Sequence, residues 1–244
     1  MADDGEPQLP ASLGRNLTFG LLDAVGRAVV IGDYENRAFP TEADLAVQYG
    51  VSRSVTREAL KMLAAKGLLS ARPKQGTFVR PQDHWNMFDP DVLRWLLDRK
   101  FSVRLLRQFN ELRVGVEPQA AALAAKRARP AQVAAIAAGL DRMRAADHGG
   151  DDTLEADIDF HVAILRASGN PFYIQFRDIV TTALRTSIRF TNRIAGRSAS
   201  IADHAAVHAA IAAGDDRRAF EAMHKLIDDV LDLIEGSDTT ASAS

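Results

Sequence analysis

The sequence contains no cysteine among its 244 residues. This absence excludes a disulfide framework, cysteine-based zinc sites and a thiol nucleophile, and it is compatible with a reducing compartment. No apolar run reaches the length of about 18 residues that a membrane-spanning helix needs. Residues 1–14 are acidic and polar, which is unlike a secretory signal peptide. We therefore expect a cytoplasmic protein with no membrane partner.

The sequence also lacks an overall excess of charge. It carries 30 Lys and Arg against 32 Asp and Glu, which at first argues against a nucleic-acid partner. The charge is unevenly distributed, however: residues 52–80 contain seven basic residues and one acid, and residues 201–244 contain three basic residues and nine acids. The basic segment is either a charged helix face exposed to solvent or a surface that binds nucleic-acid phosphates. The motif in which it lies decides between these two interpretations.

A change of sequence character near residue 90 predicts two domains. Short helical and strand-like segments precede it, and long Ala- and Leu-rich stretches follow it. The Pro-bounded segment between them is interpreted as a linker. The expected divisions are a disordered tail at 1–14, a first domain at 15–80, a linker at 81–90, an all-helical domain at 91–236 and a disordered tail at 237–244.

The first domain is predicted to be a winged helix-turn-helix. Thr41 is expected to cap the second helix, with Asp44 in the returning position of a capping box, and Ser52 to cap the third helix. A turn at 73–75 separates two short β-prone segments and predicts a hairpin. The expected elements are helices over 17–31, 41–48 and 53–66 and strands over 68–72 and 76–79.

The second domain is predicted to contain helices only. Its breaks are polar or glycine-rich, as at 148–150 and 169–171, and nothing there is typical of a strand. The expected helices lie at about 91–99, 102–127, 130–146, 151–168, 171–193, 200–213 and 215–235. The fold class is therefore mainly α, with a winged helix-turn-helix followed by an antiparallel helical bundle.

The recognition helix of a helix-turn-helix, here the helix predicted over 53–66, places its first residues against base edges in the major groove. Arg53 and Arg57 are one turn apart on this helix and share a face, and each can bond a guanine bidentately. Phosphate contacts are expected from the hydroxyls of Ser52, Ser54 and Thr56. The hairpin is expected to contact DNA through Arg72, Lys74, Gln75 and Gly76.

Residues 39–79 resemble the N-terminal domain of the GntR family of bacterial transcription regulators. The shared pattern runs Pro-x-Glu, Leu-Ala, Val-Ser-Arg-x-x-x-Arg-Glu-Ala-Leu, Gly-Leu and Gly-Thr-Phe-Val. The resemblance implies operator contacts for Arg53 and Arg57, with Gly76 in the wing. Many members carry an arginine where this chain has Ala43, so one contact of the family is absent and the preferred operator is expected to differ.

The helical part is similar to the effector domain of the FadR subfamily, the FCD domain. The similar segments are ELRVGVEPQAAALAA (111–125), ADIDFHVAILRASGNP (156–171) and DHAAVHAAIAAGD (203–215). This similarity implies a helical bundle that binds small organic acids and often a metal. Residues 84–97 most resemble regulators of sugar-acid catabolism, such as galactonate-responsive repressors.

Asp157 and His161 lie four residues apart on one predicted helix face, where a carboxylate and an imidazole can hold one cation, and His204 can add a third ligand. The resemblance implies a divalent metal of the zinc, nickel or manganese class at these positions. The family's fourth histidine falls at Leu226, which cannot ligate. His224 is two residues away, about 200° around the helix, and is expected to face elsewhere, which leaves His208, one turn after His204, as a possible substitute. Alternatively, each histidine is an ordinary hydrogen-bonded residue.

An organic acid needs a cationic partner inside an apolar bundle, and a guanidinium pairs strongly with a carboxylate. Arg113 matches the Glu-x-Arg motif of the family and is the first candidate, and Arg185 is the second. Asp157, His161 and His204 are expected to line the same pocket. For both arginines the alternative is an ordinary ion pair between or within helices.

These observations predict a homodimeric transcription regulator in which the helical domain at 91–236 binds the effector and forms the dimer. Its recognition helices are expected to read the half-sites of a pseudo-palindromic operator. We expect an organic acid in the bundle to release a repressor from double-stranded DNA. A metal-dependent enzyme built on Asp157, His161 and His204 is the alternative from another class. An architectural DNA-binding protein without an effector is a third.

Overall fold

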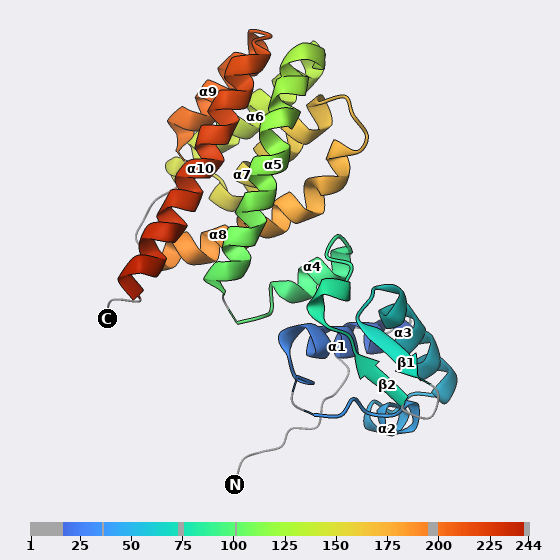
Figure 1. The fold of residues 1–244 in the computed structure, drawn as a ribbon. Coiled ribbons are helices and arrows are strands. Elements are labelled where there is room, and N and C mark those ends of the chain that lie inside the picture. Colours follow the sequence, from blue (N-terminus) through green and yellow to red (C-terminus); the bar gives the residue numbers. More distant parts are fainter. Residues whose placement is uncertain (1–16, 36, 73–75, 101, 195–199, 242–244) are drawn as a thin grey trace. The chain divides into compact units, whose positions relative to one another are not determined.

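The computed structural model describes residues 17–35, 37–72, 76–100, 102–194 and 200–241. The chain divides into two compact units, Met1–Lys100 and Phe101–Ser244, which we call the N-terminal and C-terminal units (Figure 1). The predicted tail at 1–14 lies outside the described residues. No helix in the described ranges is both long enough and apolar enough to cross a bilayer.

The N-terminal unit begins with the three predicted helices, α1 (Leu17–Ile31), α2 (Glu42–Gln48) and α3 (Arg53–Ala65). The capping box predicted before α2 is present, because the Asp44 amide donates to the Thr41 hydroxyl and the Thr41 amide donates to the Asp44 carboxylate. Ser52 caps α3 by accepting the Val55 amide at 3.3 Å. Local sequence signals therefore set where α2 and α3 begin.

The wing is a two-stranded antiparallel sheet of β1 (Leu69–Arg72) and β2 (Gly76–Val79). Its register pairs Leu69 with Val79 and Arg72 with Gly76. The turn between the strands, with Lys74 and Gln75, lies outside the described residues. The order of three helices and a hairpin confirms the predicted winged helix-turn-helix.

Residues 81–90 do not form a separate linker, because the chain from there to Lys100 belongs to the N-terminal unit. This segment contains a 3-10 turn, η1 (Gln82–His84), and helix α4 (Pro90–Leu96), which packs on α1. The Trp95 ring is fully buried, and its indole N–H donates to Asp23 at 2.7 Å. The ring fits because α1 has Gly26 here: a Cβ at that position would lie 2.2 Å from the ring.

Ion pairs hold the same segment in place. The Lys66 ammonium, at the end of α3, lies 2.8 Å from carboxylate oxygens of both Asp89 and Asp91. Asp89 also caps α4 by accepting the Asp91 amide at 2.9 Å. The division between the units therefore falls after Lys100 rather than within 81–90.

The described residues of the C-terminal unit form helices joined by turns and include no strand, as predicted. The expected helix at 171–193 is interrupted, since a 3-10 turn, η2 (Tyr173–Phe176), precedes α8. The last helix extends to Ala241, so the tail predicted at 237–244 is helical over most of its length. The helices are α5 (Val103–Arg127), α6 (Pro130–Asp147), α7 (Thr153–Ala167), α8 (Arg177–Ile194), α9 (Ile201–Ala212) and α10 (Asp216–Ala241).

One apolar cluster forms the core of this bundle, and Phe160 of α7 and Met223 of α10 are fully buried in it. The long helices α5 and α10 are antiparallel neighbours (Figure 1). Lys126 and Asp216 pair at 2.6 Å near one end, and Leu106 packs with Ile234 near the other. Because α5 also contacts α7, α8 and α9, its inward face can bring polar side chains to the middle of the bundle.

Candidate functional site

The exposed face of α3 carries the arginines predicted to read DNA. Arg53 is exposed, and the Arg57 side chain is 61% exposed with its Nε 3.3 Å from a carboxylate oxygen of Glu42. Ser52 and Ser54 are also exposed, and their hydroxyls lie 2.8 Å apart. Thr56 differs from the prediction: it is fully buried and donates its hydroxyl to the Ser52 carbonyl, so it cannot face a phosphate.

The wing adds one more cation to this unit. Arg72 is exposed at the end of β1, and its guanidinium lies over the Phe78 ring, 4.7 Å from the ring centroid. Gly76 is exposed at the start of β2. Lys74 and Gln75 lie outside the described residues, so their predicted contacts stay predictions.

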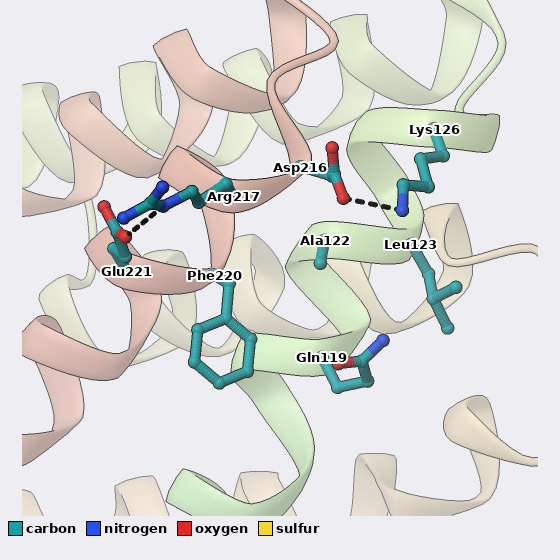
Figure 2. Close-up of a pocket in the computed structure, with 8 residues that line it drawn as sticks. All are labelled: Gln119, Ala122, Leu123, Lys126, Asp216, Arg217, Phe220 and Glu221. Carbon is teal, nitrogen blue, oxygen red and sulfur yellow. Dashed lines mark hydrogen bonds and ion pairs between the residues drawn. The ribbon is translucent and has the colours of Figure 1, made fainter.

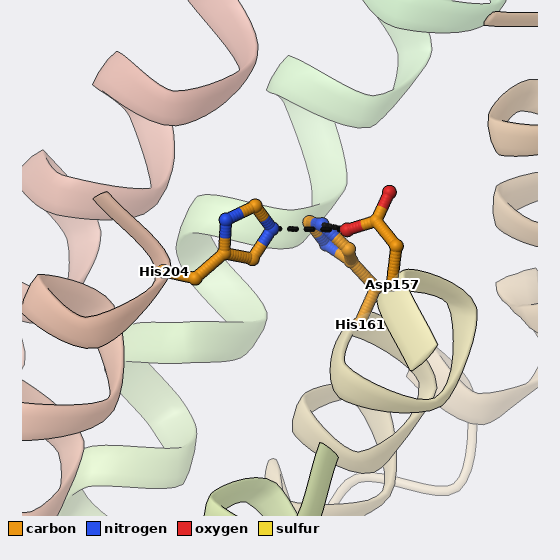
Figure 3. Close-up of side chains that lie close together, drawn as sticks. All are labelled: Asp157, His161 and His204. Atoms are coloured by element: carbon orange, nitrogen blue, oxygen red, sulfur yellow. Dashed lines mark hydrogen bonds and ion pairs between the residues drawn. The ribbon is translucent and has the colours of Figure 1, made fainter. Parts of the chain in front are cut away.

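The C-terminal unit brings the three predicted metal ligands together. Ligating atoms of Asp157, His161 and His204 all lie within 4.8 Å of one another. Figure 3 shows the Asp157 carboxylate close to both imidazoles, and one of its oxygens lies 3.0 Å from His204 Nε2 and 3.5 Å from His161 Nε2. His204 Nδ1 donates to the Ser200 carbonyl at 2.8 Å, which leaves Nε2 to face the carboxylate.

Arg113 and Glu117 extend this group from α5. Their side chains are only 3% and 1% exposed, and Arg113 Nε donates to Glu117 at 2.6 Å. His161 Nδ1 donates to the other oxygen of Glu117, and Asn110 accepts from Arg113 at 3.2 Å. Glu117 was not predicted as a site residue. Its spacing of four residues from Arg113 is the signal that could have found it, since such residues share a helix face.

Opposite charges in this buried group hold one another ionised. Burial alone would raise the pKa of Glu117, but the positive charges of Arg113 and His161 outweigh it and lower the pKa to about 2. Burial would lower the pKa of His161, but the Glu117 carboxylate raises it to about 9. Burial also opposes ionisation of Asp157, and hydrogen bonds from His161 and His204 bring its pKa well below its ordinary value. The metal-free group therefore contains balanced buried charges.

The structure does not bring every predicted residue into this group. Arg185 on α8 pairs with Glu155 at 2.6 Å, and Glu155 lies about 200° around α7 from Asp157. Leu226 is buried in the apolar core and supplies no ligand. His224 lies on α10 beside the Phe220 ring, and among the described residues neither it nor His208 joins the group of Asp157, His161 and His204.

Comparisons with known proteins match each unit separately. A model of the FCD domain matches residues 108–229, and a model described as bacterial regulatory proteins, gntR family, matches residues 35–79. The galactonate operon transcriptional repressor of Escherichia coli K12 is 34% identical over 171 residues, which cover 70% of this chain and 75% of that protein.

Two further similarities cover most of the chain. The HTH-type transcriptional regulator YieP of Escherichia coli K12 is 32% identical over 216 residues, which cover 87% of this chain and 93% of that protein. The solved structure of Streptococcus agalactiae GntR is 25% identical with a TM-score of 0.50, and the match covers 88% of this chain and 98% of that one.

Proposed function

The chain belongs to the GntR family of bacterial regulatory proteins, and on that basis we propose that it represses an operon for the catabolism of a sugar acid or another organic acid. It is a ligand-responsive, DNA-binding transcription regulator, and its relatives are regulators rather than enzymes. The metal-dependent enzyme considered from the sequence finds no support in them. A regulator of bacterial DNA is expected to work in the cytoplasm.

In this proposal α3 of each of two copies enters the major groove at one half-site of a pseudo-palindromic operator. Arg53 and Arg57 read base edges, while Ser52, Ser54 and Arg72 contact the backbone. These roles are supported by the exposure of the side chains, and the cap at Ser52 fixes where α3 begins. The pair between Arg57 and Glu42 is exposed and therefore weak enough to be exchanged for a contact with DNA.

The observation that carries the proposed acid site is the buried group of charged side chains around Arg113. Such groups are costly inside an apolar bundle, and an anion-binding role explains their presence. Arg113 already bonds Glu117 and Asn110, so a carboxylate that enters must share or replace these bonds. We place the acid against Arg113, His161 and His204. Arg185 remains outside this arrangement because it pairs with Glu155.

A divalent metal fits the donor set of Asp157, His161 and His204. One carboxylate and two imidazoles suit ions of the zinc, nickel or manganese class. The bond from His204 Nδ1 to the Ser200 carbonyl is the outer contact that directs Nε2 toward a metal. When bound, the ion would supply positive charge that favours a carboxylate or hydroxyl oxygen of the acid. Because Leu226 cannot ligate, such an oxygen could take the fourth ligand position of the family.

Acid binding is proposed to shift the protein toward a state that holds DNA poorly. The acid can change the population only by the difference in its affinity for the two states. A rearrangement of the bonds between Arg113, Glu117 and His161 would supply such a difference in affinity. It can be transmitted to the DNA-binding part because α5 is the first helix after the N-terminal unit along the chain. The predicted outcome is derepression.

A gel-shift titration tests this function with DNA from upstream of the protein's own operon. We expect a complex at low salt that D-galactonate or a related hydroxy acid dissociates, with and without added zinc. Arg144→Ala, which removes an exposed α6 arginine, is the matched control and should behave as the parent protein. No complex at low salt, or a complex unaffected by every sugar acid and carboxylate tried, would contradict the proposal.

A further inference from the structure

We infer that Glu117 is a positioning residue that determines which nitrogen of His161 can bind a metal. The inference rests on the metal site of the proposed function, and it adds to that site a residue that is not itself a ligand. Among the described residues the group that could hold an ion consists of Asp157, His161 and His204, and Glu117 contacts this group from α5.

Both oxygens of the Glu117 carboxylate accept a hydrogen bond from a different helix or turn. Oε1 accepts from Arg113 Nε at 2.6 Å, one turn earlier on α5, and Oε2 accepts from His161 Nδ1 on α7. Because the Glu117 side chain is only 1% exposed, water cannot replace either donor. The position therefore requires a side chain that accepts at two atoms, which a carboxylate does and an amide does not.

The bond to Glu117 determines the tautomer of a neutral His161. A neutral imidazole has one nitrogen that donates a proton and one that carries a free lone pair. Since Nδ1 donates to Glu117, the lone pair belongs to Nε2, the nitrogen that lies 3.5 Å from an Asp157 carboxylate oxygen. His161 is thereby set to ligate through Nε2, on the side where the other two ligands lie.

His204 shows the same arrangement on another helix. Its Nδ1 donates to the Ser200 carbonyl at 2.8 Å, and its Nε2 lies 3.0 Å from the same Asp157 oxygen. Two imidazoles from different helices thus both donate from Nδ1 and present Nε2 to one carboxylate, as metal-binding histidines do. The partner of His161 differs in being charged, and a carboxylate there makes Nε2 the stronger electron donor of the two.

The same carboxylate keeps Arg113 from blocking Nε2. Arg113 Nη2 lies 3.4 Å from both ring nitrogens of His161, so it is not aligned with the lone pair of either one. Arg113 is held in this place by its bond from Nε to Glu117. Glu117 therefore joins the residue proposed to hold the acid to a residue proposed to hold the metal.

Glu117→Gln tests this role with little change in side-chain size. Arg113 can only donate, so the one carbonyl oxygen of glutamine is expected to face it and the amide NH₂ to face His161. Nδ1 must then accept, which moves the proton of the neutral ring to Nε2 and removes the lone pair that binds a metal. We expect the zinc affinity of the full chain, measured by competition with a chromophoric chelator, to fall about 10–100-fold. The circular dichroism spectrum should stay that of the parent protein.

Glu221→Gln is the matched control. Glu221 accepts from Arg217 Nε at 2.9 Å, and the two residues are four apart on one helix, as are Arg113 and Glu117 (Figure 2). The Glu221 side chain is 57% exposed and borders a cavity of about 440 Å³, and none of the described residues that line this cavity is a histidine. This variant should bind zinc as tightly as the parent protein.

Nitrogen-15 NMR of the zinc-loaded parent protein supplies a readout that a purely structural role would not move. His161 should coordinate through Nε2 and keep its proton on Nδ1. Coordination through Nδ1, no zinc binding by the parent protein, or equal zinc affinity of a folded Glu117→Gln would overturn the inference. Gel shifts with D-galactonate and without zinc, on the same samples, keep the questions separate, because DNA binding and acid release that persist leave the proposed regulator standing.

Discussion

The two units hold their key arginines in opposite ways. The Arg57 side chain is 61% exposed and pairs loosely with Glu42, whereas the Arg113 side chain is 3% exposed and bonds Glu117 at 2.6 Å. An exposed pair contributes at most about 1 kcal/mol and can exchange partners in water. A buried pair cannot lose one member without leaving an uncompensated charge. The N-terminal unit is thus suited to bind a polyanion at its solvent-exposed surface, and the C-terminal unit is suited to bind one small anion in its interior.

Removal of the buried arginine should have the largest effect. Arg113→Met leaves Glu117 with His161 as its remaining cationic partner, and we expect a loss of about 3–5 kcal/mol of unfolding free energy. Urea unfolding followed by circular dichroism measures this loss. The double variant Arg113→Met/Glu117→Met should recover much of it, because both members of the pair are then apolar. Equal stability of Arg113→Met and the parent protein would contradict the account of the buried group.

The pH dependence of stability should be smaller but specific to the same unit. His161 has its pKa raised from 6.5 to about 9, so its contribution is complete below about pH 6.5 and is lost as pH rises toward 9. Glu117 has its pKa lowered from 4.5 to about 2, so its contribution is lost as pH falls through that range. Urea titrations with a chelator should show both trends.

His161→Gln provides the control for the alkaline trend, because glutamine has no charge to lose. Its unfolding free energy should be nearly flat between pH 6.5 and 9. An unchanged slope in this variant would assign the alkaline trend to another group. Arg53→Ala, in the other unit, should keep the parent's slope.

Gly26→Ala tests the attachment of α4 to the N-terminal unit. The added Cβ would lie 2.2 Å from the buried Trp95 ring, so α4 must shift, at a cost of about 1–3 kcal/mol. Thermal unfolding followed by tryptophan fluorescence detects the loss, since the Trp95 environment changes. The melting temperature should fall while the acid response proposed for the C-terminal unit is kept. An unchanged melting temperature would mean that Trp95 does not fasten the segment.

The exposed arginines should affect DNA binding and leave stability unchanged. Arg53→Ala and Arg57→Ala should each weaken operator binding by about 1–3 kcal/mol, the value of one bidentate contact with a base. Their unfolding free energies should stay within about 0.5 kcal/mol of the parent value. Fluorescence anisotropy and urea unfolding on the same samples make the comparison. A large loss of stability in either variant would erase the contrast with Arg113.

Features that depend on local sequence could be predicted, and those that depend on distant contacts could not. The capping box of Thr41 and Asp44 was found because its partners are three residues apart. The burial of Thr56 was missed because its hydroxyl satisfies a backbone carbonyl while its side chain faces the core. The place of α4 was missed because Gly26 receives a side chain from residue 95, far along the chain.

The candidate site shows the same division. Asp157 and His161 share a helix face by spacing, and the family resemblance added His204. The part played by Glu117 depends on α5 packing against α7, which periodicity alone does not specify. The charge of Arg185 predicts a place near the acid, but its partner Glu155 is apparent only once α7 and α8 are in position.

We propose that an acid held by Arg113 controls how tightly the N-terminal unit holds DNA. The most direct test is the anisotropy of labelled upstream DNA as D-galactonate is added to the parent protein, Arg113→Lys and Arg185→Lys. Lysine keeps the charge beside Glu117 but loses the bidentate geometry. We predict release of DNA from the parent protein and Arg185→Lys, and retention by Arg113→Lys with unchanged affinity before acid is added. Equal release from all three proteins would contradict the claim.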